Sequence, residues 1–120
     1  MRSRSDSVSI HPYFKAHAGK LAEFKALLPQ FVALTAAEPK CLYYAFTSNG
    51  DEIFAREAYA DADGVLAHLA SIGTLLGEVF KIADVVRLEL HGPAAELEKL
   101  KGPFAEFKPT WFVYETGLTA

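Results

Sequence analysis

A predicted β-hairpin in the middle of the chain constrains the fold more than any other feature. Residues 41–47, CLYYAFT, are rich in aromatic and other strand-forming side chains. The turn cluster at 48–51 contains Asn-Gly, the strongest short hairpin signal, and Glu52–Tyr59 is the expected return strand. A helical pattern precedes this hairpin and another follows it, so the fold must combine both helices with a sheet.

The segment before the hairpin has the apolar spacing of an amphipathic helix that begins after Gly19. Its apolar residues are Leu21, Phe24, Leu27, Leu28, Phe31 and Leu34. Pro29 lies inside the pattern, and because proline lacks an N–H and its ring clashes with the preceding turn, we expect a kink or break near Lys25–Leu28. The helix should end before Glu38-Pro39, because a residue that precedes proline avoids the α region.

The segment after the hairpin begins with Asp61, a good helix N-cap. Val65, Leu69 and Ile72 form its expected buried stripe. Gly73 and Gly77 weaken the pattern, so Thr74–Ile82 is expected to form a second, short helix.

Alternating apolar and polar residues predict two further strands, at Ser7–Phe14 and Asp84–His91. A short helix, AAELEKL, and a last strand at Thr110–Glu115 follow. The resulting βαββαβ order predicts an α+β, ferredoxin-like fold, in which an antiparallel sheet carries two helices on one face. We expect one domain over 1–120, with a flexible tail at 1–6 and a C-terminal extension at 93–120.

The strand at 41–47 is apolar or aromatic on both of its faces. Such a strand needs cover on both sides, and the predicted helices cover only one. A second sheet from a partner subunit is the simplest cover, so we expect a homodimer.

Charge and composition exclude several classes of protein. The net charge is −3 and no run of Lys or Arg follows a periodic face, so no nucleic-acid-binding surface is expected. No stretch is long and apolar enough to cross a bilayer, and the opening MRSRSDS, which is short and polar, is not expected to be a signal peptide. The single Cys41 excludes an internal disulfide, which fits a reducing cytoplasm.

Three stretches resemble the antibiotic biosynthesis monooxygenase superfamily: PYFKAHAGKLAEF, EPKCLYYAF and GDEIFAREAYADADGVLAHLAS. Members typically combine Glu-Pro-Gly-Cys, an aromatic strand, a strand that ends in Glu-x-(Trp/Tyr), and a helical His. The resemblance covers residues 8–91 and implies the dimeric α/β barrel fold. The activities it implies differ among members: cofactor-independent oxygenation of aromatic polyketides and quinols, haem degradation, or no known reaction.

The chain departs from this family at informative positions. Tyr59 replaces the frequent Trp and offers a phenol that can donate a hydrogen bond. Glu78 lies near the place of the iron-ligating His of the haem-degrading members, so haem degradation is not expected. If the chain is an oxygenase of this family, no cofactor is implied.

His68, Tyr59 and Glu57 are the leading site candidates. His68 borders the buried stripe, where an imidazole could act as a general base; the alternative is a structural histidine bonded to a strand carboxylate. Tyr59 could hydrogen-bond a substrate. Glu57 could support His68 or form an ion pair with Arg56 or Arg87.

His11 and Tyr13 share one parity of the first strand and are further candidates for substrate binding, although parity alone does not say which face they occupy. No His-x-His or His-x-x-x-His spacing occurs, and no carboxylate is placed in the sequence to complete such a pair, so no metal site is expected.

Two classes of function follow. The chain is expected to be a cofactor-independent monooxygenase acting on an aromatic or quinol-like substrate, or a non-catalytic dimeric module that binds a ligand or fills its cavity with its own side chains. An isomerase or decyclase of the same fold is a third possibility. An open pocket with His68 and Tyr59 on its wall favours chemistry, whereas a closed interior of Phe and Leu favours the module.

Overall fold

The computed structural model describes residues 6–118 of the chain. The elements in order are β1 (Val8–Ala16), α1 (Leu21–Ala36), β2 (Cys41–Asn49), β3 (Glu52–Tyr59), α2 (Ala62–Val79), β4 (Ala83–Gly92), α3 (Ala94–Glu98), the 3₁₀ turn η2 (Ala105–Phe107) and β5 (Thr110–Val113). The flexible tail expected at residues 1–6 lies, except for Asp6, outside the described residues.

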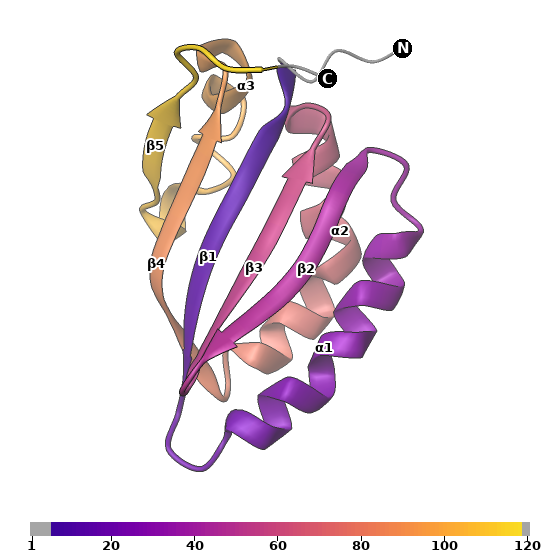
Figure 1. The fold of residues 1–120 in the computed structure, drawn as a ribbon, viewed down its shortest axis with the longest axis vertical. Helices are drawn as coiled ribbons and strands as arrows, with labels where there is room; N and C mark the ends of the chain where they lie inside the picture. The colour runs from indigo at the N-terminus through magenta and orange to yellow at the C-terminus, as the bar shows by residue number, and fades with distance from the viewer. Residues whose placement is uncertain (1–5, 119–120) are drawn as a thin grey trace.

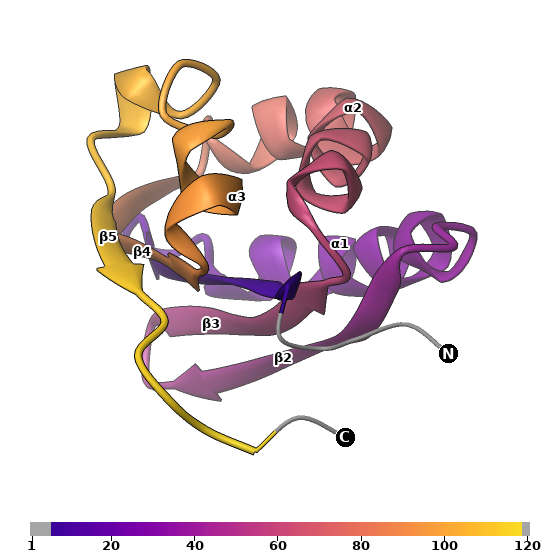
Figure 2. The ribbon, with the colours of Figure 1, turned by 90° about the horizontal axis from the view of Figure 1, so that it is seen from above.

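One five-stranded sheet, in the order β2-β3-β1-β4-β5, forms the base of the molecule (Figure 1). β1 pairs antiparallel with both β3 and β4, and β2 pairs antiparallel with β3. α1, α2 and α3 lie on the same face of the sheet (Figure 2). The ferredoxin-like α+β prediction is therefore confirmed. The appended β5 runs parallel to β4, which makes the sheet mixed.

The predicted hairpin forms with its turn at Gly50 and Asp51, between β2 and β3. Gly50 has a φ of 59°, in the left-handed region that glycine adopts without strain. Asp61 caps α2 as expected, because its side chain accepts a hydrogen bond from the backbone N–H of Gly64.

Neither helix is broken where we expected an interruption. α1 continues through Pro29, which lies on the exposed side of the helix while Phe24 and Phe31 anchor its buried side. α2 continues to Val79 through Gly73 and Gly77, which are also exposed. Each helical glycine costs about 1 kcal/mol of helix stability. Burial of the apolar face of α2 outweighs this cost, since Ile72 and Val79 are both buried.

Two register shifts change which face some strand residues occupy. One separates Tyr13 and Phe14 in their pairing with β4, and the other lies between Cys41 and Tyr43 in β2. A bulge adds one residue to one strand, so the simple alternation that we used for β4 fails there. Val85 consequently lies on the same side as Leu88, although their spacing predicts opposite faces.

Two clusters of buried side chains fill the space between the sheet and the helices. One gathers around Tyr59, Val65 and Leu90, and the other around Phe24, Ile53 and Ile72. Among the described residues, no helix is both long and apolar enough to span a membrane.

Candidate active site

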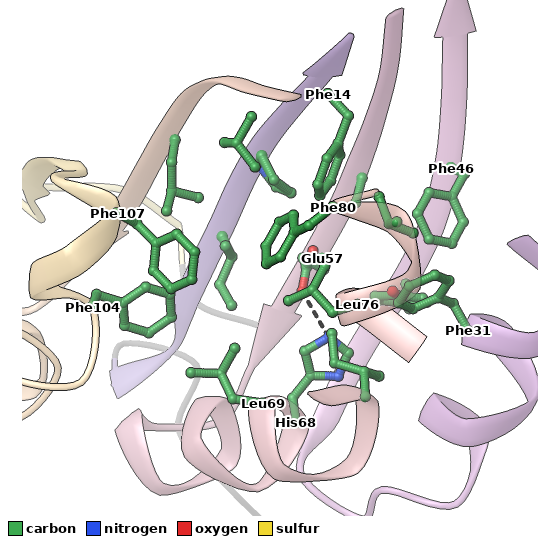
Figure 3. A pocket seen from close by; sticks show the side chains of 18 of the residues that line it. Phe14, Phe31, Phe46, Glu57, His68, Leu69, Leu76, Phe80, Phe104 and Phe107 are labelled. Carbon is green, nitrogen blue, oxygen red and sulfur yellow. Dashed lines mark ion pairs between the residues drawn. The ribbon is translucent and has the colours of Figure 1, made fainter. Parts of the chain in front are cut away.

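A pocket lies between the sheet and the helices, lined by members of both core clusters (Figure 3). The centre of a water-sized sphere can move through a volume of about 70 Å³ inside this pocket. A single water needs roughly 10–15 Å³ by this measure, so the space suits a small organic molecule. The lining is apolar except for Glu57, His68 and Tyr44. Its aromatic residues are Phe14, Phe24, Phe31, Tyr44, Phe46, Phe80, Phe104 and Phe107.

His68 is held between two carboxyl groups on the pocket wall. Its Nδ1 lies 3.0 Å from Glu38 Oε2 and 3.1 Å from Oε1, and its Nε2 lies 3.4 Å from Glu57 Oε1. The side chains of His68 and Glu57 are 2% and 4% exposed. Figure 3 shows the imidazole of α2 pointing toward Glu57 on β3. The three side chains thus form a buried carboxyl–imidazole–carboxyl chain that reaches the cavity.

Burial determines whether the side chains of Glu57 and His68 are charged. It raises the pKa of the Glu57 carboxyl to about 8, a shift that the Tyr59 hydrogen bond opposes and the nearby Glu38 adds to. Burial also lowers the pKa of His68, although the hydrogen bond to Glu38 opposes this. At neutral pH the imidazole is therefore neutral. Its Nδ1–H donates to Glu38, which leaves the Nε2 lone pair directed at a protonated Glu57.

Tyr59 supports Glu57 from behind the pocket and is not part of its lining. Its hydroxyl donates to Glu57 Oε1 at 2.8 Å, and its ring lies 4.9 Å from the His68 ring. Tyr59 is fully buried, and this burial together with the Glu57 carboxyl raises its pKa. The expectation that His68 and Tyr59 share the pocket wall is therefore met only for His68. Glu57, expected to play the supporting part, is the residue that reaches the cavity.

Tyr44 is a pocket residue that we did not identify from the sequence. It pairs with Glu57 in the β2–β3 register, and its ring lies 5.2 Å from that of His68. Burial and the neighbouring Glu57 raise the pKa of its phenol, so the hydroxyl stays protonated. The signal was available: in an antiparallel pair, the residue opposite Glu57 shares its face.

The mouth of the pocket is formed by two aromatic residues from different parts of the chain. Phe80, just after α2, and Phe107, in η2, are 40% and 38% exposed, and their ring centroids are 6.0 Å apart. Phe104 packs behind Phe107. The segment after β4 therefore builds one wall of the pocket, which the sequence pattern did not indicate.

His11 and Tyr13, expected as substrate-binding residues, lie on the other face of the sheet. The alternate residues Pro12 and Phe14 line the pocket, so His11 and Tyr13 point away from it. Their neighbours are ring systems of the outer face: His11 lies 4.4 Å from the His91 ring, and Tyr13 lies 4.7 Å from Phe54. The structure therefore places neither beside the Glu57–His68 pair.

The outer face brings together a carboxylate and two imidazoles. The ligand atoms of His11, Glu89 and His91 lie within 4.8 Å of one another. The pKa of His11 is lowered by burial and by His91, and hydrogen bonding to His91 lowers the pKa of Glu89. The spacing within single elements does not indicate this group, because β1 contributes one member and β4 the other two.

Comparison with known proteins places the chain in a family. The antibiotic biosynthesis monooxygenase model matches residues 7–75, more than half of the chain. The chain belongs to this family. MupZ from Pseudomonas fluorescens is 42% identical in its crystal structure, with a TM-score of 0.92 over 97% of this chain and 91% of MupZ. A search of curated proteins found no significant match.

More distant structures share the fold alone. SnoaB from Streptomyces nogalater, described as a cofactor-independent oxygenase, is 20% identical, with a TM-score of 0.62 over 71% of this chain and 90% of SnoaB. Rv0793 from Mycobacterium tuberculosis is 19% identical, with a TM-score of 0.65 over 72% of this chain and 94% of Rv0793.

Proposed function

We propose that the chain binds a small, largely apolar molecule in the pocket and acts on it as a cofactor-independent monooxygenase of aromatic or quinol-like substrates. The observation that carries this proposal is the buried Glu38–His68–Glu57 chain, which ends at an otherwise apolar cavity. Such a cavity selects a planar apolar ligand, and the polar chain supplies proton transfer in a site from which water is excluded.

The proton moves through the Glu57 and His68 side chains in two linked steps. Glu57 passes its own proton to His68 Nε2, and the oxygen that it frees accepts the proton of a substrate hydroxyl or acidic C–H group. Glu38 stabilises the imidazolium that results. Tyr59 keeps the Glu57 carboxyl oriented through its hydrogen bond. His68 and Glu57 are thus the acid–base pair, and Tyr59 is a positioning residue.

The substrate anion then supplies the electrons. It transfers one electron to O₂, and the substrate radical and superoxide combine to form a C–O bond. His68 and Glu57 return the abstracted proton to the peroxide anion that forms first. The resulting hydroperoxide then loses water, whose second hydrogen comes from the oxidised carbon, to leave a carbonyl. One oxygen atom thus enters the product and the other leaves as water. Membership in the monooxygenase family and the oxygenase SnoaB with the same fold support this class of reaction.

Two other functions are compatible with the same pocket. The raised pKa of Glu57 makes it a proton donor at neutral pH, which favours a redox-neutral isomerase or decyclase that needs an acid. The aromatic lining alone would serve a non-catalytic ligand-binding module. O₂ consumption distinguishes the oxygenase from both.

Oxygen uptake with a quinol or anthrone tests the proposal. We expect the wild-type chain, free of added flavin or metal, to consume one O₂ for each substrate molecule. Leu76 lines the pocket on α2, so Leu76→Trp should fill the cavity and reduce uptake by about tenfold or more. Thr74→Trp, at an exposed position of the same helix, should not. Binding without uptake would reject the oxygenase, and absence of binding would reject the ligand pocket.

We also propose that the chain forms a homodimer through the outer face of its sheet. None of the helices covers this face (Figure 2), and it carries the aromatic side chains of Tyr13, Tyr43, Phe54 and Phe112. Tyr43 and Phe112 are 52% and 41% exposed, which is unusual for aromatic residues of a sheet without a partner. A second copy that packs sheet against sheet covers these rings.

Sedimentation velocity tests the dimer. The wild-type chain should sediment as a dimer at micromolar concentration, and Phe54→Glu should give a folded monomer because a carboxylate cannot be buried unpaired between two sheets. Val32→Glu, at a 45% exposed position of α1, is the control and should remain dimeric. A wild-type monomer, or equal behaviour of both variants, would exclude this interface.

A further inference from the structure

The outer face of the sheet carries a cluster of three potential metal ligands that the proposed reaction does not use. His11 on β1 lies opposite Glu89 on β4, and His91 follows Glu89 at the next position on the same face. Their ligand atoms lie within 4.8 Å of one another. The cluster belongs to two adjacent strands in the body of the sheet, so its backbone is fixed by the ladder.

We propose that His11, Glu89 and His91 bind one divalent transition-metal ion, with Zn²⁺ as the ion that tests the site. Two imidazoles and one carboxylate are a common zinc ligand set, and they leave a position for water or a further ligand. Ca²⁺ and Mg²⁺ prefer sites made of oxygen ligands alone, so two imidazoles select against them.

The geometry needs only a small closure. Zinc holds nitrogen and oxygen ligands at about 2.0–2.2 Å, which places two ligands in a tetrahedral site roughly 3.5 Å apart. The present spread of up to 4.8 Å closes by about 1 Å through rotation of side chains, without movement of the strands. His91 Nε2 and Glu89 Oε1 are already 3.1 Å apart.

Neighbouring side chains orient the two imidazoles. A hydrogen bond of 2.8 Å joins Ser9 Oγ to His11 Nε2. The Phe112 ring stacks on His91, with centroids 4.5 Å apart and planes inclined by 16°. A fixed ring needs little ordering when the ion arrives, as at metal sites whose ligands are oriented by outer contacts.

Arg87 is a neighbour that opposes the ion. Its guanidinium forms an ion pair with Glu89 and therefore competes with a cation for the same carboxylate. The Arg87 side chain is 60% exposed in the single chain, so packing within its own subunit does not hold it against Glu89. Removal of Arg87 should consequently strengthen metal binding. If Glu89 served only as the partner of Arg87 in a structural ion pair, removal of Arg87 would not strengthen metal binding.

Isothermal titration of the tag-free full-length chain with ZnCl₂ tests the site. We expect one ion per chain with a Kd of roughly 10 µM or lower, and no heat with CaCl₂ or MgCl₂. His11→Ala and Glu89→Gln should each weaken binding by about a hundredfold, and Arg87→Gln should tighten it several-fold. His17→Ala is the matched control, since His17 pairs with Asp84 on the exposed surface and should be dispensable.

Two results would overturn the proposal. The first is an absence of saturable zinc binding in the wild type. The second is binding that His11→Ala and Glu89→Gln leave unchanged, or that His17→Ala weakens equally. Circular dichroism establishes that the variants fold. If one does not, the visible spectrum of the wild type with Co²⁺ decides, because four-coordinate ligation gives intense d–d bands and the hydrated ion does not.

Discussion

Replacement of His68 by alanine is expected to lower the free energy of unfolding by about 2–4 kcal/mol, with a fall of roughly 10 °C in Tm. The imidazole is only 2% exposed and packs against the rings of Tyr44 and Tyr59. Its removal leaves a cavity and takes away the hydrogen-bond partner of Glu38 and the imidazole that contacts Glu57. Both losses destabilise the native state.

Urea unfolding at pH 7 measures this effect, and His17→Ala supplies the control. His17 has a carboxylate partner too, but its side chain is 42% exposed, so its replacement should change the unfolding free energy by less than about 0.5 kcal/mol. If the two variants unfold at the same urea concentration, the buried contacts of His68 contribute nothing to stability.

The role of His68 shows where the sequence argument stopped. Its place at the border of the Val65–Ile72 stripe allowed either a general base or a structural histidine bonded to a strand carboxylate. The buried face of this helix can be predicted from the sequence, whereas the strands that pack against it cannot. Tyr44 and Tyr59 enclose the ring from β2 and β3, and Glu38, beyond the end of α1, reaches it as well. His68 therefore has features of both a structural and a reactive residue.

More of the fold than of the site could be predicted from the sequence, because the sequence signals for turns, caps and helix faces are local. The turn at Gly50, the cap at Asp61 and the apolar faces of both helices each act within a few residues. The register shifts were not predictable, since a bulge is set by pairing with a neighbouring strand and not by the pattern of its own.

The site depends on contacts between distant segments, and those were the ones missed. Phe104 and Phe107 reach the pocket from beyond β4, although their own stretch contains only a short helix and a 3₁₀ turn. The burial of the Glu57 side chain was not predicted, because Arg56 and Arg87 were plausible ion-pair partners for it. The structure pairs it instead with Tyr59 and His68.

Replacement of Glu57 by glutamine should change how stability depends on pH. Burial raises the pKa of this carboxyl from its ordinary 4.5 to about 8 in the folded protein. The stabilising effect of keeping it protonated is complete below its ordinary pKa and is lost as the pH rises through about 8. The wild type should therefore lose a few kcal/mol between pH 5 and pH 9, up to a limit of about 5 kcal/mol at 1.36 kcal/mol for each pKa unit.

Glutamine cannot ionise, so Glu57→Gln should escape this loss and become the more stable form above about pH 8, in unfolding curves measured at several pH values. His68 remains in both proteins, and its lowered pKa reduces stability toward acid, so the comparison isolates Glu57 in the alkaline range. Glu52→Gln, exposed on the same strand, should follow the wild type.

Turnover should fall by about a hundredfold in Glu57→Gln alone, because the amide can neither accept nor return the substrate proton. Parallel stability profiles for the wild type and Glu57→Gln would show that Glu57 is ionised in the folded protein, and the proton chain through His68 would then have to be abandoned.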